Sequence, residues 1–245
     1  MTVDVITIFP EMFNEVLGVG ILGRTQTKGL LQINLHNLRD YAEDKHLSVD
    51  DYPYGGGSGM IMKPEPIFNA VESLENDDSL TEIILLTPQG KTLTQQKVQR
   101  LSLEEHLILI CGRYKGVDER VRESLITDEV SVGDYVLSGG EIPAMILIDA
   151  IARIIPGALS DYESAQYDSF ADELLDCPHY TRPAEFRGMK VPDILMKGNH
   201  ELIKKWKRQQ SLKRTYERRP ELLKDAILSD EDKNFIKTLE DERTN

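Results

Sequence analysis

The chain has 245 residues, 40% of which are hydrophobic, and a formal net charge of −13. A chain of this size and composition can bury a substantial core, which excludes a wholly disordered protein. No apolar run reaches the ~20 residues of a membrane-spanning helix, and the first residues lack a signal peptide's basic start and apolar core. Cys111 and Cys177 lie far apart, without metal-ligand spacing. We expect a cytoplasmic protein with reduced thiols, no metal site and no membrane partner.

The charge is distributed unevenly. Residues 182–219 contain 12 Lys or Arg and 4 Asp or Glu, so the remainder of the chain has a net charge of −21. A basic segment on an acidic protein is compatible with phosphate binding. It is equally compatible with the solvated face of helices.

The first forty residues favour alternating strands and helices. Residues 3–8 and 31–36 alternate apolar and polar side chains and are predicted to be strands. A helix is expected to begin near Pro10, and a second is expected over residues 21–28. His36, at the end of the second strand, is expected to be a surface or hydrogen-bonded residue.

A glycine-rich segment follows over residues 49–60. Four glycines within residues 55–59 exclude a helix or a central strand. A linker between domains has a similar composition, but a predicted helix over residues 64–74 places the segment inside a domain. Glycine-rich loops with aromatic and acidic neighbours are typical of sites that close on a substrate.

Continuous apolar runs over residues 82–86 and 106–111 predict strands buried on both faces, with a connecting helix over residues 94–101. A third strand is predicted over residues 129–132. Each strand is followed by a turn-prone segment containing glycine. Parallel sheets bind ligands beyond the carboxyl ends of their strands. The sequence therefore predicts an α/β domain with a ligand site formed by three loops.

The third of these loops contains Gly133, Gly139 and Gly140 and precedes a predicted helix over residues 144–155. Its spacing matches neither a dinucleotide-binding fingerprint nor a P-loop. Taken alone, it is equally compatible with a ligand loop and with an ordinary strand–helix turn.

The last third of the chain has few strand signals. We expect an α/β domain over residues 1–160, a polar linker over 161–170 and a small helical domain over 171–245. Helices are predicted over residues 201–219 and 231–239, with irregular structure over 177–183.

Several motifs resemble the bacterial tRNA (guanine-N(1)-)-methyltransferase family in collinear order. They are Thr-Pro-Gln-Gly at 87–90, Cys-Gly-Arg-Tyr at 111–114, Gly-Val-Asp-Glu-Arg at 116–120, Val-Gly-Asp-Tyr-Val-Leu-Ser-Gly-Gly-Glu at 132–141, Pro-Ala-Met at 143–145, Tyr-Thr-Arg-Pro at 180–183, Gly-Asn-His at 198–200 and the glycines at 55–59. The resemblance covers nearly the whole chain.

This resemblance implies a SPOUT-type α/β fold with a parallel sheet and a deep trefoil knot, followed by a small helical domain. It implies a homodimer with its active sites at the interface. The implied reaction transfers a methyl group from S-adenosylmethionine to N1 of guanosine 37 in tRNAs with guanosine 36, with magnesium as a possible cofactor. The helical domain would bind the anticodon stem-loop.

The resemblance also implies site residues. Asp168 corresponds to the family's general base, and Arg153 to the cation that assists at the base O6. Arg24, Asp50, Gly57, Gly59 and Met60 would border the substrate base. The methyl donor would lie among Leu86, Pro88, Gly112, Tyr114, Val132, Gly133, Asp134, Tyr135, Val136, Leu137, Gly139, Gly140 and Pro143.

One residue departs from the family pattern. Lys115 occupies a position where the family usually has Glu, which reverses the charge there. This weakens the expectations of magnesium use and of contact with guanosine 36. Two alternatives are another SPOUT RNA methyltransferase, acting on a ribose or a different base, and a catalytically silent tRNA-binding module. The presence of both Arg153 and Asp168 argues against the silent module.

Overall fold

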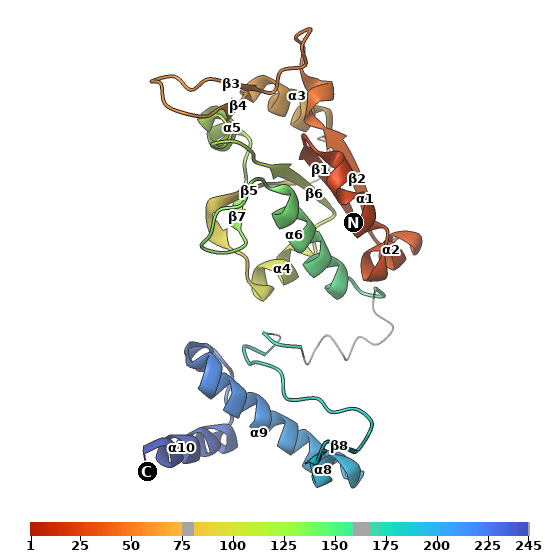
Figure 1. Ribbon diagram of the computed structural model, residues 1–245, viewed down its shortest axis with the longest axis vertical. Coiled ribbons are helices and arrows are strands. Elements are labelled where there is room, and N and C mark those ends of the chain that lie inside the picture. Colours follow the sequence, from red (N-terminus) through yellow and green to blue (C-terminus); the bar gives the residue numbers. More distant parts are fainter. Residues whose placement is uncertain (75–80, 159–167, 171, 245) are drawn as a thin grey trace. The chain divides into compact units, whose positions relative to one another are not determined.

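The computed structural model describes residues 1–74, 81–158, 168–170 and 172–244. The chain forms two compact units, Met1–Ser160 and Asp161–Asn245. The first unit is an α/β domain, and the described elements of the second are mostly helical (Figure 1).

A parallel five-stranded sheet forms the centre of the first unit, which confirms the predicted sheet type. The strand order is β2-β1-β6-β5-β7. Val5 of β1 pairs with Leu35 of β2 on one side and with Leu109 of β6 on the other. The strand bounds are Thr2–Thr7 for β1, Gln32–Asn37 for β2, Thr81–Thr92 for β5, His106–Cys111 for β6 and Asp128–Ser131 for β7.

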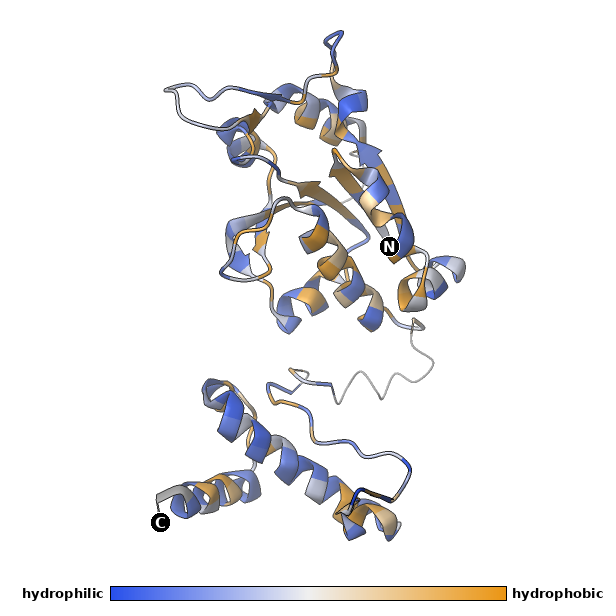
Figure 2. Cartoon of the chain, viewed as in Figure 1, coloured by the Kyte–Doolittle hydropathy of each residue, from blue (hydrophilic) through white to orange (hydrophobic). Residues whose placement is uncertain are grey.

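Helices cover both faces of this sheet, because its strands are apolar on both sides. Val3 and Val5 of β1 point into one core, and Ile6 and Ile8 into the other. The sheet is accordingly apolar between more polar helices (Figure 2). The first core includes side chains of η1 (Pro10–Phe13), α1 (Asn14–Leu17), α2 (Gly20–Thr27), α4 (Gln95–Leu101) and α6 (Glu141–Ile154). The second includes side chains of η2 (Leu38–Tyr41), α3 (Pro64–Leu74) and α5 (Glu119–Ser124).

Strand β5 is longer than the sequence pattern indicates. It continues through Thr87–Gly90, where a turn is expected, to Thr92. After a register shift, Lys91 and Thr92 pair with Val130 and Ser131 of β7. Gly90 permits this close crossing, because a Cβ atom there would lie 2.5 Å from the Val130 nitrogen.

The glycine-rich segment forms the loop of a short hairpin. Its strands are β3 (Asp50–Asp51) and β4 (Ile61–Met62), paired antiparallel. Met62 also forms an isolated parallel bridge with Val117. The hairpin is therefore attached to the segment that follows β6.

The second unit contains α8 (Asp193–Met196), α9 (His200–Arg218), η3 (Pro220–Lys224) and α10 (Asp230–Thr244). Helix α9 begins where the Asn199 side chain accepts a hydrogen bond from the Leu202 N–H at 3.2 Å. Arg208 of α9 pairs with Asp232 of α10 at 3.1 Å. A small hairpin, β8 (Glu185–Phe186) and β9 (Met189–Lys190), lies in a segment without strand signals. Among the described residues, no helix is both long and apolar enough to span a membrane.

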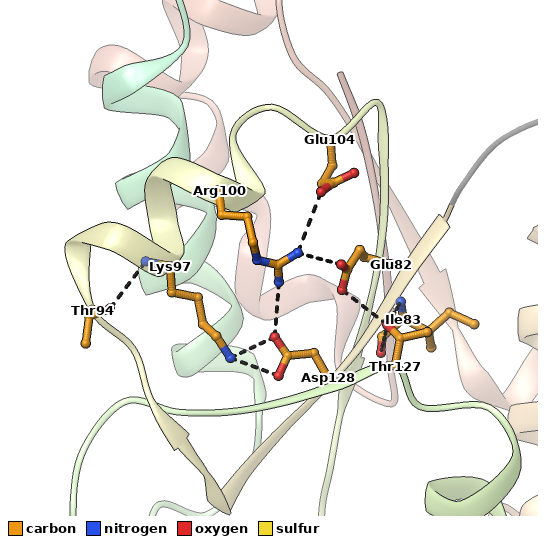
Figure 3. A network of polar contacts seen from close by, with 8 residues as sticks. All are labelled: Glu82, Ile83, Thr94, Lys97, Arg100, Glu104, Thr127 and Asp128. Atoms are coloured by element: carbon orange, nitrogen blue, oxygen red, sulfur yellow. Dashed lines mark hydrogen bonds and ion pairs between the residues drawn. The ribbon is translucent and has the colours of Figure 1, made fainter.

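An ion-pair network attaches α4 to the sheet (Figure 3). Arg100 contacts Glu82 of β5 at 2.5 Å and Asp128 of β7 at 3.3 Å. Lys97 contacts the same Asp128 at 2.7 Å. We call Glu82, Lys97, Arg100, Glu104 and Asp128 the α4 network.

Candidate functional site

A pocket lies where three segments meet beyond the carboxyl ends of the parallel strands. Its lining residues come from β5 (Leu85, Thr87, Pro88 and Gln89), from the segment after β6 (112–117), and from the end of β7 with the segment after it (130–133 and 135–139). Glu119 and Arg122 of α5 and Pro143 of α6 complete the lining. Residues of all three segments singled out in the sequence therefore line one cavity, although residues 87–90 belong to strand β5 and do not form the expected loop.

Ten of the thirteen residues expected around a methyl donor line this pocket. They are Pro88, Gly112, Tyr114, Val132, Gly133, Tyr135, Val136, Leu137, Gly139 and Pro143. The other three lie outside the lining. Leu86 is buried in the first core, Asp134 is exposed, and Gly140 packs against the backbone of Cys111.

A buried carboxylate ties two of the pocket segments to the sheet. Glu141, at the start of α6, is 1% exposed. Its Oε2 accepts a hydrogen bond from Arg113 Nε at 3.1 Å, and its Oε1 accepts one from the Thr7 hydroxyl at 2.8 Å. The Arg113 guanidinium also lies 4.5 Å from the centre of the Phe9 ring. We call Thr7, Arg113 and Glu141 the pocket network.

Glycines 139 and 140 allow this network to form. A Cβ atom at Gly139 would lie 2.2 Å from Arg113 Nε, and one at Gly140 would lie 2.6 Å from the Cys111 Cα. The Gly140 N–H donates to the Gly112 carbonyl at 2.9 Å. Only residues without a side chain fit where the two loops approach so closely.

The glycine-rich hairpin adjoins the pocket through backbone hydrogen bonds. The Lys115 N–H donates to the Met60 carbonyl at 3.1 Å, and the Met62 N–H donates to the Gly116 carbonyl at 3.0 Å. The structure therefore brings Gly59 and Met60, expected on the substrate side, next to a pocket-lining residue. Gly57 lies in the exposed loop of the same hairpin.

Asp50 of the hairpin interacts with Tyr114 of the pocket. Burial raises the pKa of Tyr114, and the charge of Asp50 and the hydrogen bond that the phenol donates to its carboxylate raise that pKa further. Tyr114 has a φ of 58°, the left-handed region, and its side chain is 46% exposed. Two residues expected in different parts of the site thus contact each other.

Several charged or polar pocket residues were not expected from the sequence: Gln89, Arg113, Glu119 and Arg122. Arg122 contacts Glu129 and Gln89, and its Nε donates to Glu129 Oε1 at 3.3 Å. Arg113 lies within the Cys-Gly-Arg-Tyr motif at 111–114, so that motif could have identified it as a pocket residue. Arg122 lies on α5, outside the segments that follow the strands, and only the fold brings it to the pocket.

The chain matches a known family over most of its length. The family model described as tRNA (Guanine-1)-methyltransferase TrmD matches residues 1–225. The chain belongs to this family. The resemblance inferred from the motifs is therefore confirmed.

Curated relatives support the same assignment. A tRNA (guanine-N(1)-)-methyltransferase of Dictyoglomus turgidum is 54% identical over 242 residues, covering 99% of this chain and 98% of the relative. Proteins of the same name from Geobacillus kaustophilus and Bacillus cereus strain G9842 are 52% and 50% identical. Each of these two alignments covers 99% of this chain and 100% of the relative.

The two expected catalytic residues lie in different units. Arg153 is exposed in the last turn of α6, in the first unit. Asp168 is exposed and belongs to the second unit. Arg24, expected on the substrate side, is exposed on α2, and its Nε donates to the Gly20 carbonyl at 3.2 Å. None of these three side chains lines the pocket of the first unit.

A group of potential metal-ligating side chains lies in the second unit. Within the described parts of the chain, Asp176, Cys177 and His179 form the one group with three ligand atoms within 4.8 Å of each other. His179 Nε2 lies 2.7 Å from Asp176 Oδ2, and the Cys177 N–H donates to Asp176 Oδ1 at 2.6 Å. These hydrogen bonds account for the cluster without an ion. Both cysteines are free and buried, and burial raises the pKa of each thiol.

Proposed function

We propose that the protein transfers a methyl group from S-adenosylmethionine to N1 of guanosine 37 in tRNAs that carry guanosine 36. The observation that carries this proposal is the pocket, because ten residues implied by the family motifs line one cavity. Membership of the tRNA (guanine-1)-methyltransferase family supports the substrate and the reaction.

The pocket residues suit the methyl donor. Gly112, Gly133 and Gly139 line the pocket without side chains, so a ligand can approach the backbone there, as binding of adenine and of the donor's amino acid portion requires. Tyr135, Val136 and Leu137 offer apolar surface for a purine ring. The bound donor would supply a methyl group on a positively charged sulfur.

Guanine N1 carries a proton that must leave as the new N–C bond forms. We propose that the Asp168 carboxylate accepts this proton, and that the Arg153 guanidinium stabilises negative charge developing on the base O6. The two residues are exposed in different units, which is compatible with a site completed by a second protomer. We accordingly propose a homodimer with the active site at its interface.

The substrate RNA would contact both units. On the first unit, we propose that Arg24, Asp50, Gly57, Gly59 and Met60 border the target base. Hairpin residues Gly59 and Met60 adjoin Lys115, which supports this assignment. On the second unit, the cations of α9 would bind anticodon-stem phosphates.

We also infer that the chain forms the deep trefoil knot of SPOUT enzymes, followed by a separate tRNA-binding helical domain, and that it acts in the cytoplasm. The contacts between the segments after β6 and after β7 support the knot, since Arg113 and Gly139 form an antiparallel bridge. Magnesium has no proposed role. The described pocket residues include a single carboxylate, that of Glu119, and they include Lys115.

Incubation with labelled S-adenosylmethionine and tRNA transcripts that differ at positions 36 and 37 tests this function. We expect methyl incorporation only where guanosine occupies both positions, measured with and without magnesium. Incorporation at a ribose or at another base would identify a different RNA methyltransferase. Absence of incorporation by a folded protein that binds the donor would identify a silent tRNA-binding module.

Substitution of Asp168 tests the proton acceptor. Asp168→Asn should keep the donor's dissociation constant but reduce single-turnover methyl transfer by at least ~100-fold, the scale of general base catalysis. Asp172→Asn, an exposed carboxylate in the same unit, serves as the matched control. Turnover near the wild-type rate in the Asp168 variant would show that the proton leaves by another route.

A further inference from the structure

Three cationic side chains line the pocket within the described part of the chain: Arg113, Lys115 and Arg122. Two of them are held by carboxylates. Arg113 donates to the buried Glu141, and Arg122 pairs with Glu129. These two guanidinium groups are therefore committed to holding the pocket segments together.

Lys115 differs from the two arginines. Its side chain is exposed, and no carboxylate among the described residues lies within ion-pair distance of its ammonium group. The other nearby acids have partners of their own, since Glu119 lies 3.8 Å from Arg122 and Asp50 interacts with Tyr114. The Lys115 charge is thus available to an incoming anion.

The stem of Lys115 follows the glycine-rich hairpin. Its Cγ, Cδ and Cε atoms lie 3.2 to 3.5 Å from the place where a Cβ atom of Gly59 would be. The Lys115 N–H is held by the Met60 carbonyl. In the loop of the same hairpin, Tyr52 and Tyr54 are 78% and 102% exposed. Exposed aromatic rings and a free cation together are typical of surfaces that bind single-stranded nucleic acid.

We propose that Lys115 binds a backbone phosphate of the substrate RNA beside the base that is methylated. This inference rests on the proposed function and adds a residue that binds the substrate RNA directly. A lysine suits this role, because its compact ammonium group can donate hydrogen bonds to a phosphate that approaches from many directions. A positive charge at residue 115 also reduces the repulsion of RNA, since the chain outside residues 182–219 has a net charge of −21.

The donor's carboxylate is the competing anion. The contact of Lys115 with Gly59 and Met60 favours the RNA, because these residues belong to the hairpin and do not line the pocket. Measuring the binding of tRNA and of S-adenosylmethionine separately distinguishes the RNA phosphate from the donor's carboxylate.

Lys115→Met removes the charge and keeps the stem that packs on Gly59. We expect the dissociation constant for tRNA, measured by fluorescence anisotropy, to rise about tenfold, the scale of one charge-assisted hydrogen bond. The slope of log affinity against log salt should decrease in magnitude by about 0.7–0.9, the contribution of one phosphate contact. The dissociation constant for S-adenosylmethionine should not change, and Lys115→Arg should restore most of the tRNA affinity.

Lys45→Met is the matched control, since Lys45 is also exposed and does not line the pocket. Equal tRNA affinity and salt slope for the two methionine variants would overturn the proposal. Weaker donor binding with unchanged tRNA binding would overturn it in favour of the donor carboxylate. Because binding is measured directly, these results stand even where methylation occurs at another nucleotide, an outcome that would contradict only the proposed function.

Discussion

The pocket network and the α4 network join similar charges in different surroundings. In the pocket network, the Glu141 side chain is 1% exposed and that of Arg113 is 16% exposed. In the α4 network, Arg100 is 45% exposed and Glu82 is 24% exposed, although more ion pairs are present (Figure 3). Water screens exposed pairs, whereas a buried charge that loses its partner remains unsolvated. Burial, more than the number of ion pairs, therefore sets the cost of breaking each network.

The two networks also hold different parts of the first unit. Glu141 joins β1, the segment after β6 and the start of α6, all at the pocket end of the sheet. The α4 network joins a helix to residues near the beginnings of β5 and β7. Disruption of the first should alter both stability and the pocket, whereas disruption of the second should alter stability alone.

The largest effect is expected for Glu141→Ala. This change leaves the Arg113 guanidinium without its carboxylate and opens a buried space, so the free energy of unfolding should fall by about 3–5 kcal/mol. Urea unfolding followed by circular dichroism measures the change. Glu82→Ala, which removes a carboxylate from the α4 network, is the control. Similar losses for the two variants would show that burial does not separate the networks.

An intermediate effect is expected for Asp4→Asn. Asp4 is 5% exposed, and its carboxylate contacts His36 at 2.6 Å, His106 at 2.7 Å and Asn34 at 2.9 Å. Loss of these charged hydrogen bonds should cost about 1–3 kcal/mol at pH 7, measured by urea unfolding. Asp40→Asn, at an exposed position, should cost less than about 0.5 kcal/mol.

The Asp4 effect should also depend on pH. Burial opposes ionisation, but the hydrogen bonds from His36, Asn34 and His106 outweigh it and hold the pKa of Asp4 below its usual value of 3.8. The carboxylate therefore stabilises the fold above pH 3.8, and this stabilisation is lost as the pH falls through the lowered pKa. The difference between wild type and Asp4→Asn should decrease below pH 3.8. A difference that grows as the pH falls below 3.8 would contradict this.

The smallest effect is expected for Arg100→Gln. The Arg100 side chain is 45% exposed, and its partners Glu82 and Asp128 are 24% and 19% exposed, so the free energy of unfolding should fall by less than about 1 kcal/mol. This loss should shrink when salt is raised, because screening already weakens the pair in the wild type. The S-adenosylmethionine affinity should stay unchanged. A loss as large as that of Glu141→Ala, or one insensitive to salt, would show that the α4 network behaves as a buried one.

The local sequence pattern was sufficient to predict many of the strands and helices. The apolar run over residues 106–111 coincides with β6, and helix α3 occupies residues 64–74 as predicted. The first follows from a continuous apolar run and the second from helical periodicity, and the chain has both patterns before any distant contact forms. The hairpin β8–β9 was missed because its strands have only two residues each, too few for a period to appear.

By itself, the sequence determined the buried parallel strands, the glycine-containing segments after them and the family motifs. Only the tertiary structure decided which side chains meet. Thr7, Arg113 and Glu141 are 28 to 134 residues apart and come together because β1 and β6 are neighbours in the sheet. Asp50 reaches Tyr114, and Lys115 reaches Gly59, because β4 bridges to the segment after β6. Such contacts depend on strand order and on the approach of loops, which no local periodicity encodes.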